Sequence, residues 1–279
     1  MKKGRFSTII LILIFLTGLS LLLYPTVSDY WNSLHQSRAI TEYAEQVAAL
    51  DDDRYEQLWA EAEQYNRHLS QKADRFKLSA EEQTEYEGLL NVSSSGIISY
   101  IEIPAIGCAL PIYHGTDEAV LQIAVGHIEG TSLPVGGKGT HCVLSGHRGL
   151  PSAKLFSDLD QLREGDTFLL QTLDETLTYE VDQIRIVLPY EVTDLAISEE
   201  QDYCTLVTCT PYGVNSHRLL VRGRRIANQE MAKQIRVTAD AMQIEPMLIA
   251  PFVAVPMLLA LLIVLLASTH RKKHKEENP

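Results

Sequence analysis

Cysteine, tryptophan and basic residues are scarce in this chain of 279 residues, which has four cysteines, two tryptophans and a net charge of −12. The acidic excess argues against a nucleic-acid partner, because phosphate binding needs a basic face. No cysteine spacing resembles a metal site or a small disulfide-stapled scaffold, so no metal or cofactor is expected. Two disulfides stay open for an exterior protein, but free thiols are favoured. The four are Cys108, Cys142, Cys204 and Cys209.

Charged residues are missing altogether from two long stretches. Residues 6–28 and 246–269 are apolar, and each is long enough to cross a bilayer as a helix. Basic residues flank them on their outer sides, in "MKKGR" and "HRKKHK", so the positive-inside tendency places both termini in the cytoplasm. The sequence predicts a two-pass protein of the cell membrane whose intervening segment is extracellular. The alternatives are a cleaved signal peptide for the first stretch and a buried core helix for the second.

Proline and glycine are absent from residues 31–87, where apolar residues recur at helical spacing. This pattern predicts two or three amphipathic helices, with the "DDD" of residues 51–53 as a break and N-cap. The periodicity weakens in "HLSQKADRFKLSAEEQ", residues 68–83, which indicates a loop. We therefore expect an anchor over residues 1–28 and a helical region over 29–95.

From residue 96 onward, short β-branched or alternating runs are punctuated by Gly, Pro, Asn and Asp. Runs such as "AVLQIAVGHIEG" and "LTYEVDQIRIVLP" predict about seven or eight strands in 96–226, as in a small closed barrel or sandwich. One helical insertion is expected at 151–162. A linker helix over 227–245 would then lead to the second span, followed by a cytoplasmic tail over 270–279.

Cys209 stands between two threonines at the end of a predicted strand, in "TLVTCTPYGVNSHRLLVRGR", residues 205–224. Pro, Gly and Asn after it predict a reversal of the chain, and Arg218 begins the return strand. An antiparallel hairpin of this size would make Cys209 and Arg218 neighbours. A guanidinium beside a thiol favours the thiolate and can donate two hydrogen bonds to an oxyanion, so the pair suits nucleophilic catalysis.

Such chemistry also needs an imidazole to protonate the leaving amine. His147 is the preferred candidate because "LSGHRG" leaves a strand into a glycine-rich turn, whereas His141 is mid-strand and His217 should face away from Arg218. The plain alternatives are a packed cysteine, a surface arginine and a turn histidine satisfied by its own backbone. The five histidines of the β region are His114, His127, His141, His147 and His217.

The stretch "TLVTCTPYGVNSHRLLVRG" resembles the TLxTC signature of sortases, the membrane-anchored transpeptidases of Gram-positive bacteria. "GHIEGTSLPVGGKGTHCVLSGHRGLPSAKLF" resembles the other half of their site. The resemblance implies a mainly β fold, a closed eight-stranded barrel with amphipathic helices before it and a transmembrane helix at each end. It also implies that Cys209 is the nucleophile, His147 the acid and base, and Arg218 the oxyanion ligand, with Thr208 shaping the site.

The end of that stretch, the "HRGLP" after the histidine and the second apolar span are similar to class C, the pilin-polymerising sortases. That class covers its empty site with a lid of Asp, Pro and an aromatic residue. The corresponding residues here are Asp74 and Phe76 in "KADRFKL", with Arg75 in place of the proline. Because this change removes a fixed φ, a looser lid or a plain polar loop is the alternative.

The reaction that the resemblance implies is cleavage of an LPxTG-like sorting signal at its Thr–Gly bond, followed by transfer of the acyl group to a lysine amine of another pilin. The expected partners are pilin subunits or surface proteins with such signals, together with the lipid bilayer. One alternative is a sortase of another class, which attaches proteins to peptidoglycan.

Two further alternatives lie outside the family. A surface protein or pilin-like adhesin would share the apolar span and basic tail, but no LPxTG-like pentapeptide precedes residue 246. A papain-like protease would need its cysteine at a helix N-terminus, whereas Cys209 ends a predicted strand.

Overall fold

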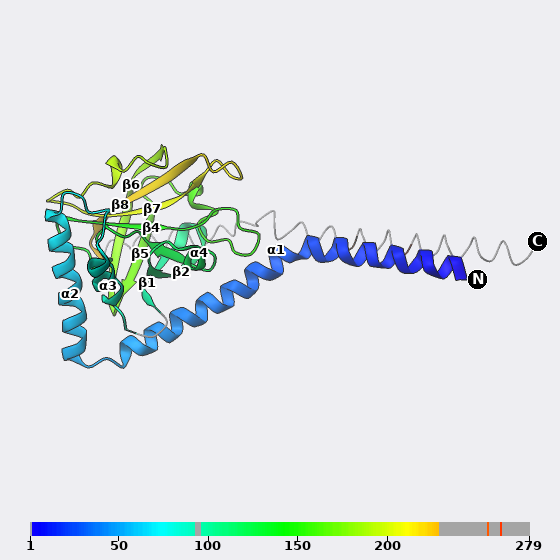
Figure 1. The fold of residues 1–279 in the computed structure, drawn as a ribbon, viewed down its shortest axis with the longest axis horizontal. Helices are drawn as coiled ribbons and strands as arrows, with labels where there is room; N and C mark the ends of the chain where they lie inside the picture. Colours follow the sequence, from blue (N-terminus) through cyan, green and yellow to red (C-terminus); the bar gives the residue numbers. More distant parts are fainter. Residues whose placement is uncertain (1, 93–95, 229–255, 257–262, 264–279) are drawn as a thin grey trace, which may run out of the picture. The chain divides into compact units, whose positions relative to one another are not determined.

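The computed structural model describes residues 2–92, 96–228, 256 and 263. Eight strands close into a barrel in the order β1-β2-β3-β4-β7-β8-β6-β5, which confirms the predicted mainly β fold (Figure 1). The strands are β1 Ile97–Ile103, β2 Cys108–His114, β3 Val125–His127, β4 Thr140–Ser145, β5 Thr167–Thr172, β6 Glu175–Val187, β7 Asp202–Thr210 and β8 His217–Ile226. Alternate residues of these strands fill the interior, as the buried Cys204 and Leu206 of β7 illustrate.

One edge of the barrel collects three chain segments. Strand β4 runs parallel to β7, and β7 is antiparallel to β8. The end of β4, the end of β7 and the start of β8 therefore lie at the same rim. The predicted hairpin between the last two strands is confirmed.

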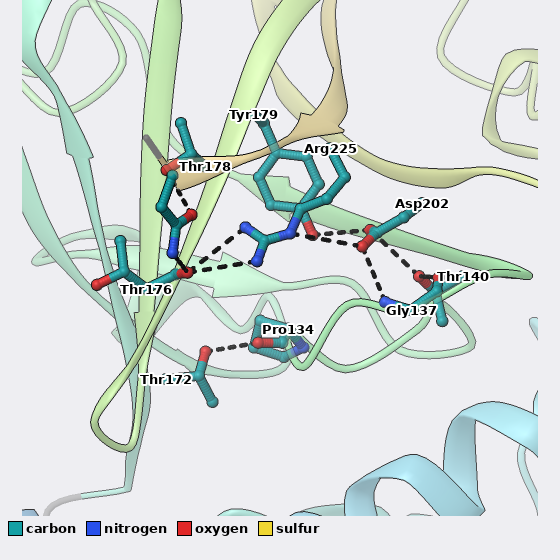
Figure 2. Close-up of polar contacts among 10 residues, drawn as sticks. Pro134, Gly137, Thr140, Thr172, Thr176, Thr178, Tyr179, Asp202 and Arg225 are labelled. Atoms are coloured by element: carbon teal, nitrogen blue, oxygen red, sulfur yellow. Dashed lines mark hydrogen bonds and ion pairs between the residues drawn. The ribbon is translucent and has the colours of Figure 1, made fainter. Parts of the chain in front are cut away.

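The opposite end of β7 is closed by a fixed polar network around Asp202 (Figure 2). Its carboxylate accepts from the Gly137 amide at 2.8 Å and from the Tyr179 hydroxyl at 2.9 Å, and the Arg225 guanidinium lies 3.9 Å away. Burial raises the pKa of Asp202, and these donors oppose that effect. The network ties the loop before β4 to β6, β7 and β8.

Three helices precede the barrel, namely α1 Lys2–Ala48, α2 Asp52–Gln71 and α3 Ala80–Gly88. Asp51 caps α2 by accepting from the Arg54 amide at 2.8 Å, which confirms the predicted break. Ser79 and Glu82 form a capping box that starts α3. The predicted loop is therefore shorter than expected and lies between Gln71 and Ala80.

Two buried tyrosine hydroxyls attach the helices to the barrel. Tyr43 of α1 donates to the Ile98 carbonyl at 3.0 Å and accepts from the Leu173 amide at 2.8 Å. Tyr86 of α3 lies 2.8 Å from His127 Nδ1 and accepts from the Gly115 amide at 3.0 Å. Helices α2 and α3 lie side by side next to the barrel (Figure 1).

Helix α1 continues without interruption from the first predicted span into the amphipathic region, with Pro25 inside it. Its segment Ile9–Ala48 is long and apolar enough to cross a membrane. Among the described residues, the start of α1 up to Tyr30 forms one unit, and the chain from Trp31 onward forms a second, which contains the barrel. The second predicted span, 246–269, lies outside the described residues except for two positions, and so do almost all of the linker helix and all of the tail.

Two local predictions from the sequence were wrong. The run 119–130 is not one strand, because it contains part of the short helix α4 Glu118–Leu121 and then β3. The stretch 151–162 contains turns and the single 3₁₀ turn η2 Leu159–Gln161 instead of a helix. Leu155 has φ +40°, a left-handed conformation that interrupts a right-handed helix.

Candidate active site

The parallel pairing of β4 with β7 sets the geometry at the rim. The two strands pair at a constant offset, from Thr140 opposite Asp202 to Ser145 opposite Val207. The same offset of 62 residues persists beyond β4, since Thr208 Oγ1 donates to the Gly146 carbonyl at 2.8 Å. It recurs where Arg148 Nη1 lies 3.4 Å from Thr210 Oγ1.

His147 and Cys209 have this same offset and lie between those two observed pairs. The continued offset therefore gives His147 and Cys209 corresponding places on the two segments. On the other side of β7, Cys209 pairs directly with Arg218 of β8. Residues 147, 209 and 218 thus lie on three adjacent segments at one rim.

The thiol lies on the outer face of the barrel wall. Cys209 lies two residues after Val207 and therefore shares its face of β7. Val207 packs outside the main core against Val143, Leu195 and Leu220. Cys209 and Arg218 are both half-buried. A position that is fixed by a strand pair yet open to a peptide is what a nucleophile requires.

Arg218 is held at the start of β8 by its own hairpin. Its Nη1 donates to the carbonyls of His217 at 3.1 Å and Asn215 at 3.3 Å. A guanidinium has five N–H donors, so donors remain for an oxyanion beside Cys209. The arrangement suits stabilisation of a tetrahedral intermediate.

His147 occupies a turn that packs tightly behind it. A Cβ at Gly146 would lie 2.7 Å from the Phe156 ring, so only glycine fits before the histidine. The His147 carbonyl accepts from the Phe156 amide at 3.1 Å. Its buried Nε2 has no hydrogen-bond partner within the described chain and lies 3.9 Å from the Glu118 carboxylate.

The other barrel histidines have different surroundings. His127 lies inside the barrel with Tyr86, and His141 Nε2 is 2.7 Å from Thr205 Oγ1. His217 Nδ1 lies 2.9 Å from Ser216 Oγ. Burial lowers the pKa of His114 and of His141 to about 4, which keeps both neutral near pH 7.

A shallow groove lies on the outer face of the barrel, over β6, β7 and β8. It is lined by Asp194, Thr205, Leu220, Arg222, Gln183 and Arg185. The 3₁₀ turn η3 Thr193–Leu195, in the connection between β6 and β7, forms one of its walls.

Arg148 is a residue of the rim that the sequence analysis did not single out. Its guanidinium pairs with Asp160, contacts Thr210 and lies 5.9 Å from the centre of the Tyr212 ring. It therefore ties the turn after His147 to the turn after Cys209. Its place next to the histidine in "SGHRG" was the available signal.

The two predicted lid residues make other contacts in the described structure. Asp74 pairs with Lys77 at 2.9 Å, and the Phe76 ring lies under the Arg75 guanidinium at 4.4 Å. The lid assignment stays a prediction. All four cysteines are free, as favoured from their spacing.

Comparisons with known proteins bear on the same region. A family profile described as a sortase domain matches residues 101–226. Sortase A of Bacillus anthracis is 26% identical over 225 residues, which is 80% of this chain and 96% of that protein.

Solved structures give a closer match. Sortase C1 from Streptococcus agalactiae is similar with 50% identity and a TM-score of 0.66, over 68% of this chain and 99% of that one. Sortase C of Streptococcus pneumoniae, whose structure was described in terms of catalysis and pilin substrate specificity, is similar with 43% identity and a TM-score of 0.60. That match covers 68% of this chain and 97% of the other.

Proposed function

Because this chain belongs to the sortase family of cysteine transpeptidases, we propose that Cys209, His147 and Arg218 form its active site and that it joins pilin subunits. The single observation that carries this proposal is the register of β4, β7 and β8, in which the three residues occupy neighbouring positions at one rim. Thr208 would support the site through its hydrogen bond to the Gly146 carbonyl.

The first half of the reaction forms a thioester. The Cys209 sulfur attacks the threonine carbonyl carbon of an LPxTG-like signal, and Arg218 holds the negative charge that develops on the carbonyl oxygen. The C–N bond to glycine then breaks, and His147 gives a proton to the departing amine.

The second half transfers the acyl group. A lysine ε-amine of another pilin attacks the thioester carbonyl, His147 removes a proton from that amine, and the Cys209 sulfur leaves. The products are an isopeptide bond and the regenerated thiol–imidazole pair. A half-buried site beside an outer groove suits two large substrates that arrive one after the other.

Pilins are the preferred substrates because solved class C sortases are similar over nearly their whole length, including one described in terms of pilin substrate specificity. The apolar helix α1 supports a membrane anchor. The two-pass topology, with an extracellular catalytic domain and cytoplasmic termini, rests on the sequence alone. A shared membrane would raise the effective concentration of anchored substrates.

The second candidate function is attachment of surface proteins to peptidoglycan. The similarity to sortase A of Bacillus anthracis over 80% of the chain favours it. The two functions differ in the acyl acceptor, a lysine side chain in one and a cell-wall amine in the other.

The experiment incubates the full-length protein with an LPxTG-type peptide and two competing acceptors, a pilin-derived lysine peptide and a peptidoglycan stem peptide. We expect the isopeptide product from the lysine peptide, detected by mass spectrometry, and no product with Cys209→Ala. Transfer only to the stem peptide would contradict pilin joining. Unchanged product formation by Cys209→Ala would contradict the active site.

A further inference from the structure

Arg75 bridges two loops that are far apart in the sequence. Its Nη1 donates to the Gly130 carbonyl at 2.8 Å, and its Nη2 donates to the Leu195 carbonyl at 2.6 Å. The guanidinium also covers the Phe76 ring at 4.4 Å. The segment between α2 and α3 is thus fastened to the β3–β4 connection and to the β6–β7 connection.

The backbone of this segment is in close contact with one of those loops. Gly130 has φ +76°, and a Cβ on it would lie 2.2 Å from the Arg75 carbonyl oxygen. A side chain there is excluded both by the conformation and by the contact. The close contact with Gly130 therefore fixes the Arg75 backbone, and this in turn positions the side chain for its two hydrogen bonds.

Leu195 connects this contact to the proposed active site. Its side chain is buried against Val143, Val207 and Leu220. Val207 lies two residues before Cys209, and Leu220 lies two residues after Arg218, on the same outer face. Leu195 also ends η3, next to Asp194 in the wall of the groove.

We propose that Arg75 is a positioning residue that fixes the β6–β7 connection, residues 188–201, as one wall of the groove for the sorting peptide. A forked guanidinium can donate to two widely separated carbonyls at once, in a fixed geometry. If the wall is already fixed, peptide binding does not have to supply the free energy that ordering the wall would cost. The assignment of the peptide to this groove rests on the proposed function.

The test compares Arg75→Met with Arg67→Met in the full-length protein. Arg67 lies on the same helical region in an exposed pair with Glu63, so its replacement removes the same charge without touching the groove. In Arg75→Met we expect the amides of 192–196 to exchange hydrogen about tenfold faster, with the other strands unchanged.

The kinetic readout separates positioning from chemistry. For Arg75→Met we expect KM for the sorting peptide to rise about tenfold while kcat stays within about twofold, because peptide binding is weakened and the reacting groups are not. Arg75→Lys should fall between, since an ammonium reaches one carbonyl and not both. Arg67→Met should match the natural protein in both measurements.

Gly130→Ala provides an independent variant, because the new Cβ would push the Arg75 backbone away while leaving the guanidinium intact. It should reproduce the local exchange and the raised KM. The proposal is overturned if both variants leave exchange at 188–201 unchanged, or if exchange rises equally in every strand. Should the natural protein fail to process the peptide, the proposed function falls, and local exchange alone decides the role of Arg75.

Discussion

Strand β7 carries two cysteines, and its two faces place them in contrasting environments. Cys204 faces the barrel interior, pairs with Cys142 across the β4–β7 seam and lies in the same sealed region as His127. Cys209 faces outward at the end of the same strand and pairs with Arg218 of β8. In the proposed active site, this outward thiol works with the His147 imidazole, so each thiol has a histidine to compare.

Access to solvent and a nearby cation separate the two sites. Burial, followed by the contact with Cys142, raises the pKa of the Cys204 thiol well above its usual range, so this thiol stays neutral and unreactive. The rim has a half-buried thiol and a half-buried guanidinium. Residue types alone therefore do not define an active site, because position on the strand decides whether a peptide can reach the sulfur.

The largest expected difference is between two variants, one that removes the rim histidine and one that removes the interior histidine. His147→Gln should lower kcat by about 10³-fold, because the proton for the leaving amine is lost, and should change the free energy of unfolding little. His127→Gln should instead destabilise the fold by about 1–3 kcal/mol, because His127 contacts Tyr86 and the Ser132 carbonyl, while folded protein remains active. Steady-state rates and urea unfolding of both variants check this, and an active His147→Gln would contradict it.

Removing the cation at the rim should have the next largest effect. Arg218→Met should lower kcat by about 10²-fold, since an oxyanion ligand is lost while the β7–β8 pairing is kept. Arg218→Lys should recover part of that loss. Arg224→Met, six residues along the same face and paired with Glu180, serves as the control and should leave kcat largely intact. Equal losses of kcat in the two methionine variants would mean that the Arg218 charge affects folding and does not act on the oxyanion.

The part of the site that could be predicted from sequence is the local part. Cys209 and Arg218 lie on one hairpin, so alternation and a turn signal were enough to pair them. His147 is different, because its pairing to β7 is parallel and spans 62 residues. Such a register depends on the whole barrel, so residue patterns only favoured His147 among five histidines, and the family resemblance supplied the stronger reason for choosing it.

The same distinction explains the errors in the fold. The number of strands was predictable because turn signals are local, whereas the choice of a closed barrel over a sandwich came from the family resemblance. The short helix α4 and the irregular stretch 151–162 were not, since the φ of Leu155 and the packing of Phe156 under Gly146 are set by tertiary contacts. Arg75 had been read as a departure from a lid pattern, and its two carbonyl partners come from distant loops.

A smaller effect is expected from Thr208, which directly precedes Cys209 on β7. Thr208→Val keeps the shape of the side chain but leaves the Gly146 carbonyl without its donor, so the turn that holds His147 loosens. We expect kcat to fall about tenfold and the free energy of unfolding to fall by about 1 kcal/mol. Thr172→Val, which removes a similar bond to the Pro134 carbonyl (Figure 2), should lower stability alone. A kcat that falls equally in both variants would reject a specific role for Thr208.

The last effect appears only on acidification and concerns the buried imidazoles, which have no proton-transfer role in the proposed reaction. Desolvation lowers the pKa of His141 and of His114 from 6.5 to about 4. Below pH 6.5 the unfolded chain binds protons that the folded chain refuses, so stability decreases as pH falls through the window from 6.5 to 4. Each histidine should contribute up to about 2 kcal/mol of this loss between pH 7 and pH 5.

Urea unfolding at pH 7, 6 and 5 measures this slope, and His141→Gln should remove about half of it because His114 remains. His141 Nδ1 donates to the Ala196 carbonyl just after η3, a bond that favours the protonated imidazole, so burial is the cause of the lowered pKa. A slope of stability with pH that is identical in both proteins would show that His141 is not the group that titrates.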